Sequence, residues 1–137
     1  MKAKEGILDN LGTVLTAELT AVHQYLFHAE LCRHWGYERL AEKFQQLYTE
    51  EVTHSAQLVR HMLYLGGQPD VGTLDTVKGG RSVQELFETN LAFEREDVDM
   101  LRKAIVQAVK VGDFTTRHKL EEMVVDSEEH EIGRAHV

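Results

Sequence analysis

Apolar side chains recur along this chain at alternating steps of three and four residues, the period of an α-helix that buries one face. One segment with this period runs from about Glu5 to His34, and a second from about Arg39 to Tyr64. A third begins after Ser82, where Glu85 three residues on completes a capping-box pattern. A fourth follows the turn at Gly112-Asp113. The pattern therefore predicts four helices.

The breaks between these segments are of two kinds. Gly36 and Gly112 mark short turns, which place the helices on either side antiparallel to each other. The stretch from Gly66 to Gly80 is longer, loses the apolar period and contains Pro69, the only proline. We therefore expect an all-α fold, a ferritin-like four-helix bundle built from two antiparallel hairpins joined by a long crossover.

Polar side chains interrupt the apolar seam of the second segment. Its seam positions are Leu40, Phe44, Leu47, Glu51, His54, Leu58, His61 and Leu65. Glu51 and His54 thus occupy core positions one helical turn apart. An unpaired buried carboxylate costs several kcal/mol, and the i, i+3 spacing lets an oxygen and an imidazole converge on one ion. The pattern predicts a cation between them.

The other helices offer further ligands at the same height. Glu18 and Glu51 lie at comparable distances on either side of Gly36, as do Glu94 and position 127 on either side of Gly112. Antiparallel residues equidistant from a turn share a level, because both helices rise by the same amount per residue. We expect Glu18, the Glu51–His54 pair, Glu94 and the 127–130 pair to form one layer.

Composition narrows the function without fixing it. A chain of 137 residues is long enough for one domain with a real core, and its net charge of −8 argues against nucleic acid and membrane surfaces as partners. Cys32 is the only cysteine, so no intrachain disulfide forms. We interpret it as a packing residue in a reducing cytoplasm. The N-terminus lacks a signal-peptide pattern, and no apolar run approaches membrane length.

Carboxylates combined with one or two imidazoles suit iron or manganese better than structural zinc. One buried histidine is more often a hydrogen-bonded core residue, and a single seam glutamate is often misassigned. Three glutamates and two histidines in one layer are harder to explain in that way. A pair of bridged ferrous ions would neutralise the three seam glutamates, with water or oxide making up the remainder, and each ion could give an electron to dioxygen or peroxide. The arrangement resembles that of the ferritin-like diiron-carboxylate family, and this resemblance implies a diiron centre.

The motifs around these positions resemble those of bacterioferritin, over the chain from Met1 to about Glu131. They are AELTAVHQY at 17–25, HWG at 34–36, EEVTHS at 50–55, LGGQP at 65–69, LAFE at 91–94 and DSEEH at 126–130. The resemblance implies a cytoplasmic cage of many subunits that oxidises ferrous iron and stores the ferric mineral. It implies that the ferroxidase ligands are Glu18, Glu51, His54, Glu94 and His130, with Glu51 as a bridge. Tyr25 would lie close by as a supporting or redox residue.

One departure from the family concerns the ligand set. The fourth helix of the family carries Glu-x-x-His, and its glutamate falls on Ser127 here. The layer is then one negative charge short, and we expect weaker binding of the second iron and slower or altered oxidation. Glu131 lies one turn along roughly the same face, whereas Glu128 points about 100° away and needs a register shift to substitute.

Other departures concern haem and electron transfer. The family holds haem between two subunits with a methionine at the position of Val52, and valine cannot ligate iron. We expect no haem from this chain alone, and a mixed cage would need a methionine-bearing second subunit. The family's inner-surface histidine and aspartate fall on Gln46 and Glu50, of which only Glu50 can hold iron.

The end of the chain does not continue the pattern. Residues 132–137, with a glycine in the middle, can be translated from a sequence that looks like the start of a common sequencing adapter. We expect a ferritin-like diiron domain over residues 1–131 and a non-native tail over 132–137, so that His136 is no ligand.

Several other polar residues have simpler interpretations. We expect the remaining histidines to be solvated or at interfaces: His23, His28, His34, His61 and His118. The acidic runs 94–97 and 128–129 could guide iron, but a solvated helix face is the simpler account.

Three functional hypotheses remain open. The first is an iron-storage ferroxidase that acts on ferrous iron with dioxygen or peroxide, as a homo-oligomer or in a mixed cage with a second bacterioferritin subunit. The second is a catalytically weak structural subunit of such a cage. The third is a peroxidase related to rubrerythrin, which the absence of a Cys-x-x-Cys pair disfavours.

Overall fold

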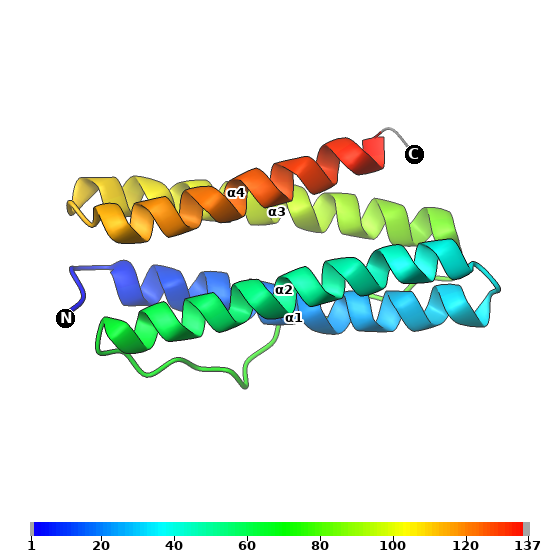
Figure 1. Ribbon diagram of the computed structural model, residues 1–137, viewed down its shortest axis with the longest axis horizontal. Helices are drawn as coiled ribbons and strands as arrows, with labels where there is room; N and C mark the ends of the chain where they lie inside the picture. The colour runs from blue at the N-terminus through cyan, green and yellow to red at the C-terminus, as the bar shows by residue number, and fades with distance from the viewer. Residues whose placement is uncertain (1, 136–137) are drawn as a thin grey trace.

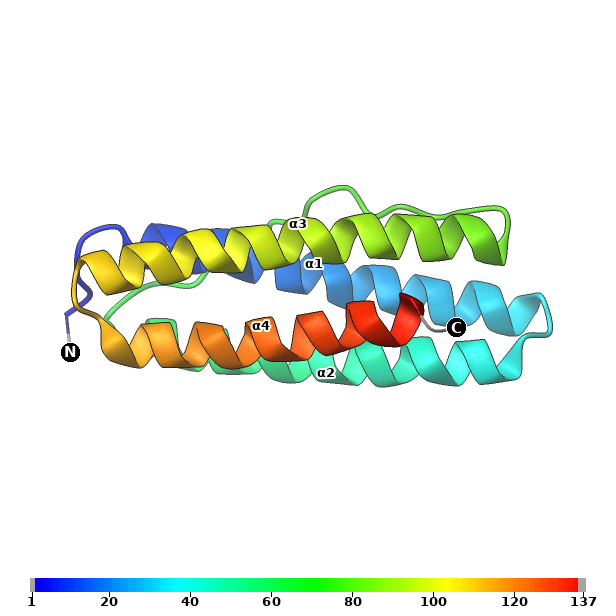
Figure 2. The ribbon, with the colours of Figure 1, turned by 90° about the horizontal axis from the view of Figure 1, so that it is seen from above.

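The protein is a bundle of four long helices, seen in a computed structural model that describes the backbone of residues 2–135 and the side chains of residues 2–129. The helices are α1 (Ile7–His34), α2 (Glu38–Tyr64), α3 (Val83–Lys110) and α4 (Phe114–Ala135). Figure 1 shows the α1–α2 hairpin lying against the α3–α4 hairpin, and in Figure 2 α3 lies over α1 and α4 over α2. The predicted all-α fold, with two hairpins and a long crossover, is confirmed.

Each short turn is built around a glycine with a positive φ angle. After α1, Gly36 has φ 87° and donates its N–H to Arg33 O, while the N–H of Tyr37 reaches Cys32 O at 2.8 Å. This is the Schellman motif, which satisfies the last carbonyls of a helix and favours glycine because a Cβ is strained there. Gly112, with φ 74°, ends α3 in the same way. The two glycines used to predict the turns thus have a conformational reason to be there.

The crossover runs the length of the bundle before α3 begins (Figure 1). It is tied to α1 by the backbone N–H of Asp75, which donates to Thr20 Oγ1 at 2.9 Å, and by His28 Nε2, which lies 2.6 Å from Lys78 O. The Ser82 side chain caps α3 by accepting the N–H of Glu85 at 3.2 Å, as predicted. These contacts fix the path of the crossover along α1 and the point at which α3 begins.

The apolar core is divided into two clusters. One fills the end of the bundle near the Gly112 turn and includes Leu11, Leu58, Leu101 and Leu120; the other fills the end near the Gly36 turn and includes Tyr25, Phe44 and Leu86. Cys32 is fully buried in the second cluster, where burial raises the pKa of its thiol, so its interpretation as a packing residue is confirmed. A layer of polar side chains separates the clusters.

Two histidines were predicted incorrectly. His28 and His61 are buried rather than solvated. His28 Nδ1 lies 2.8 Å from the Asn90 side chain, and His61 Nε2 lies 2.7 Å from the Thr116 hydroxyl. Hydrogen bonds to Asn90 on α3 and to Thr116 on α4 make these imidazoles core residues, because a satisfied polar group can be buried at little cost.

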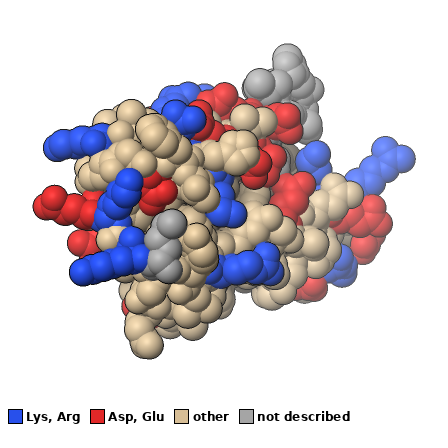
Figure 3. All heavy atoms as spheres, turned by 60° about the vertical axis from the view of Figure 1, so that its left-hand side comes forward, with Lys and Arg blue, Asp and Glu red and all other residues tan. Residues whose placement is uncertain are grey.

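The surface carries both signs of charge. On the face seen in Figure 3, Lys and Arg side chains are interspersed with Asp and Glu side chains. Within the described residues, none of the helices has the length and apolar character needed to cross a membrane. The segment 132–135 continues α4 in its backbone, while its side chains and residues 136–137 lie outside the described part, so the domain boundary at residue 131 stays a prediction.

Candidate metal centre

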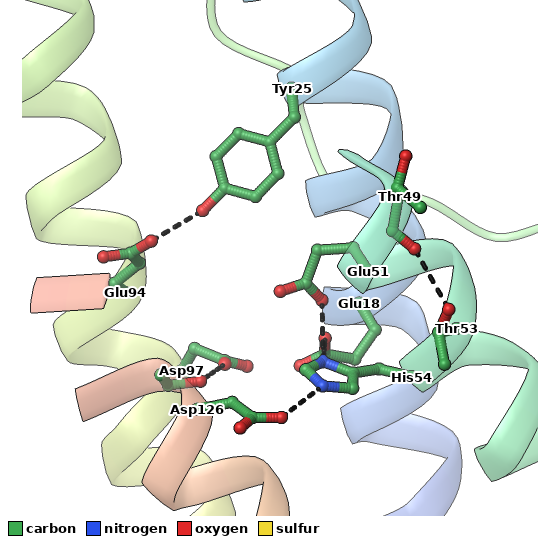
Figure 4. A network of polar contacts seen from close by, with 10 residues as sticks. Glu18, Tyr25, Thr49, Glu51, Thr53, His54, Glu94, Asp97 and Asp126 are labelled. Atoms are coloured by element: carbon green, nitrogen blue, oxygen red, sulfur yellow. Dashed lines mark hydrogen bonds and ion pairs between the residues drawn. The ribbon is translucent and has the colours of Figure 1, made fainter. Parts of the chain in front are cut away.

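The polar layer between the two apolar clusters gathers side chains from all four helices. Every member is at most 6% exposed, so water can satisfy little of its polarity. The layer consists of Glu18 from α1, Glu51 and His54 from α2, Glu94 and Asp97 from α3, and Ser127 from α4. Figure 4 shows the charged members, which converge from both sides of the bundle.

Glu18, Glu51 and His54 form the tightest group. His54 Nδ1 lies 3.5 Å from Glu51 Oε2 and 3.6 Å from Glu18 Oε2. One donor atom from each residue lies within 4.8 Å of the others, close enough for all three to contact a single ion. The i, i+3 spacing on α2 and the matched height of Glu18 on α1 produce this convergence, as the sequence predicted.

The other nitrogen of His54 is held from α4. His54 Nε2 lies 2.9 Å from Asp126 Oδ2 (Figure 4). Burial alone would lower the pKa of His54, but the neighbouring carboxylates of Glu18 and Asp126 raise it to about 9. An outer carboxylate of this kind fixes the ring so that the inner nitrogen faces the ion. In the metal-free protein a proton on His54 supplies positive charge to the layer.

Glu94 reaches the layer from α3 and is oriented by a tyrosine. The hydroxyl of Tyr25, which is 1% exposed, donates to Glu94 Oε1 at 2.7 Å. A charge-assisted bond of this length holds the carboxylate in one position. This contact matches the expectation that Tyr25 lies beside the site.

Asp97 is a member of the layer that the sequence analysis missed. It lies one helical turn after Glu94, is 5% exposed, and its Oδ2 accepts a hydrogen bond from Ser127 Oγ at 3.3 Å. Burial, and next the nearby charge of Glu18, raise the pKa of Asp97 to about 9. The acidic run 94–97 was interpreted as a solvated helix face. That holds for Arg95 and Glu96, and is wrong for Glu94 and Asp97, which are buried.

The chemistry of this donor set fits a divalent cation. Among the described residues, Glu18 Oε2, Glu51 Oε2 and Asp97 Oδ1 are buried without a hydrogen-bond partner. A buried carboxylate oxygen that lacks a donor costs several kcal/mol, and a hard cation held by oxygen and imidazole ligands removes that cost.

The remaining sequence candidates fall in different places. Glu128 pairs with Arg102 at 2.7 Å on the surface, so its carboxylate is directed away from the layer. Gln46 and Glu50 are exposed on α2. The side chains of His130 and Glu131 lie outside the described residues. Asp126 was missed because it lies one residue before Ser127, the position that the family motif assigns to a ligand. Asp97 could have been found, since it follows Glu94 at the same i, i+3 spacing that links Glu51 and His54.

A groove of about 390 Å³ leads from the surface to His54. It lies between α2 and α4, and four carboxylates line it: Glu50, Glu122, Asp126 and Glu129. The groove gives a cation an acidic path to the buried layer, because clustered negative charge raises the local cation concentration.

Four antiparallel helices that bury glutamates and a Glu-x-x-His pair in one layer define a protein of the ferritin-like diiron-carboxylate class. Comparison with known proteins gives the same result, since residues 8–132 match the family of ferritin-like domains. The chain belongs to this family.

Its relatives are bacterioferritins. The chain is 32% identical to the bacterioferritin of Mycobacterium leprae and 34% identical to that of Mycolicibacterium paratuberculosis, in each case over 130 residues that cover 95% of this chain and 82% of the relative. Its fold matches the 2.6 Å structure of Rhodobacter capsulatus bacterioferritin, which has a metal-free dinuclear site and haem iron in a crystallographic special position. That match has a TM-score of 0.97 and 30% identity and covers 98% of this chain and 84% of that one. The chain is accordingly an iron-storage protein with ferroxidase function, from a family that assembles as multi-subunit cages and binds iron at a diiron site.

Proposed function

We propose that Glu18, Glu51, His54, Glu94 and His130 are the iron ligands of this ferroxidase, and that Glu51 bridges the two ions. The observation that carries the proposal is that Glu18 Oε2 and Glu51 Oε2, which have no hydrogen-bond partner, both face His54 Nδ1 within 3.6 Å. All three residues are buried between two apolar clusters, where only a cation or a proton can compensate their charge.

The side chains around the ligands prepare them for ferrous iron. His54 must lose its proton before its Nδ1 can bind a cation, and Asp126 keeps hold of the Nε2–H while this happens. Tyr25 keeps the Glu94 carboxylate directed at the layer. Ferrous iron bound there supplies the electrons that reduce dioxygen or peroxide, and the ferric product is stored as mineral within the assembly.

The proposals for haem binding and for a partner subunit both depend on Val52. Val52 lies on the outer face of α2 and is 41% exposed, so it is available for contact with another subunit. Because valine offers no donor atom, we propose that an assembly of this chain alone binds no haem axially, and that haem requires a second subunit bearing methionine in a mixed cage. We place this assembly in the cytoplasm, as the family relationship implies.

A second function is favoured by Ser127. It is buried in the layer at the position where the ligand pattern has a glutamate. Its neutral hydroxyl donates to Asp97, so position 127 supplies no carboxylate ligand. If that loss disables the centre, the chain serves as a structural subunit and a second chain carries out oxidation.

Stopped-flow oxidation of ferrous iron by the assembled chain separates the two functions. A fast phase that saturates at a small fixed number of ions per subunit is expected of a ferroxidase. Glu51→Gln should abolish that phase, whereas Glu42→Gln, the same change at an exposed position of α2, should leave it intact. Slow oxidation without saturation in the parent protein would contradict the ferroxidase assignment and favour the structural subunit.

A further inference from the structure

Asp97 presents a carboxylate to the metal layer from α3. Its side chain is 5% exposed and its Oδ1 has no hydrogen-bond partner among the described residues. In Figure 4 the Asp97 carboxylate points across the bundle toward the Glu18 and His54 side chains. Leaving a buried carboxylate oxygen without a donor is costly, so a proton or a cation must lie beside Asp97 Oδ1.

Ser127 lies beside this aspartate. Its hydroxyl donates to Asp97 Oδ2 at 3.3 Å, so the serine orients the aspartate and leaves Oδ1 for another partner. A glutamate at position 127 would instead place a second carboxylate against Asp97, and two buried like charges repel. The two residues therefore suit each other: the short neutral side chain on α4 makes room for the acidic side chain on α3.

We propose that Asp97 is an iron ligand that replaces the carboxylate missing at position 127, so that the centre takes its fourth carboxylate from α3 instead of α4. The inference rests on the proposed ferroxidase centre and adds one residue to it. It also reverses the expectation that the centre is one negative charge short, because Glu18, Glu51, Glu94 and Asp97 together carry the charge that balances two divalent ions.

Two other acids were considered for this role: the side chain of Glu131 lies outside the described residues, and Glu128 is used elsewhere. Glu128 is held by Arg102 at 2.7 Å, with a 45% exposed side chain. For Glu128 to reach the layer, that ion pair would have to break and the helix would have to shift its register. Asp97 needs neither change, since it is already buried in the layer.

Binding of Co²⁺, a probe ion that has the same charge as ferrous iron, tests the proposal without relying on activity. The chelator-treated assembly is titrated by equilibrium dialysis and by the visible absorption of bound Co²⁺. We expect two ions per subunit for the parent and a loss of roughly 10-fold or more in affinity for one of them in Asp97→Asn. Glu96→Gln removes the same charge from the neighbouring exposed position and should bind as the parent does.

A ligand swap supplies the second test. Ser127→Glu in the Asp97→Asn background restores a carboxylate from α4 and should recover the second ion, whereas Ser127→Glu alone should add no ion beyond the parent. Asp97→Cys should show a thiolate-to-cobalt charge-transfer band that Glu96→Cys lacks, which reports direct coordination even where stability changes.

The outcomes distinguish failure of the proposed metal centre from failure of the role of Asp97 in it. A parent that binds no Co²⁺ at the layer overturns the proposed centre itself. A parent that binds two ions, together with an Asp97→Asn variant that binds both with unchanged affinity, overturns the role of Asp97 and leaves the centre standing. An additional ion in Ser127→Glu would also overturn it, because the parent would then lack a ligand after all.

Discussion

If Asp97 is kept buried for the sake of an ion, the metal-free protein should be more stable when a side chain that cannot ionise replaces it. The perturbation is Asp97→Asn, which keeps the size of the side chain and an oxygen that can still accept from Ser127. Burial and the charge of Glu18 raise the pKa of Asp97 from 3.8 to about 9. The folded protein therefore holds a proton that the unfolded chain releases above about pH 4.

The sign and size follow from this difference. Asp97 favours the folded state fully below its unfolded pKa, and that contribution is lost as the pH rises through the folded pKa. At pH 7 the loss spans about three pH units at ~1.4 kcal/mol each, or ~4 kcal/mol. Asparagine carries no such loss, so we expect the variant to be more stable than the parent by roughly 3 kcal/mol at pH 7, or about 10 °C in Tm.

The assay is urea unfolding of the chelator-treated assembly between pH 4 and pH 9, at one protein concentration because the chains associate. The free-energy difference between Asp97→Asn and the parent should be near zero at pH 4 and grow as the pH rises. Glu96→Gln is the control and should show no such growth. A difference that does not change with pH, or a variant less stable than the parent at pH 7, would refute the reasoning.

The remaining predictions concern single contacts. Asp126→Asn weakens the carboxylate that fixes the His54 ring, and Co²⁺ affinity should fall by roughly 10- to 100-fold in an equilibrium titration; unchanged affinity would contradict this role. Tyr25→Phe removes the hydrogen bond to Glu94 and should cost the protein about 1–2 kcal/mol in urea unfolding, a loss that would be absent if water replaced the hydroxyl. Val52→Met should give the purified assembly a haem absorbance with a bis-thioether signature; haem with that signature already in the parent would refute the proposal for Val52.

The fold was predictable because its signals are local. Helical periodicity, the Ser82 cap and the turn glycines each depend on a few neighbouring residues, and the structure shows the same helices within a few residues at their starts. Antiparallel packing then carries the three residues Glu18, Glu51 and His54 to one height with no further information. The tight group in the layer is thus a direct consequence of chain spacing.

His28 and His61 were missed for the opposite reason. Whether a polar residue on a helix is buried depends on how the helix is rotated against neighbours from another hairpin, which the period of one helix defines only roughly. His61 is buried because Thr116 on α4 meets it, and His28 because Asn90 on α3 and the crossover do. These partners lie 50 or more residues away in the sequence, so no local pattern reports them.

The charge of the layer connects these observations. Four buried carboxylates cannot all remain ionised without cations. In the metal-free protein, protons on His54 and Asp97 compensate the negative charge, and the pKa values of both groups are raised to about 9. Iron binding must then release protons, because a cation and a proton compete for the same buried oxygens and nitrogen. The serine at position 127 fits this balance: it orients Asp97 without adding a fifth acid, which a site of two divalent ions could not neutralise. The departure from the family motif on α4 and the buried acid on α3 are therefore best understood as one change, a ligand moved from one helix to its neighbour.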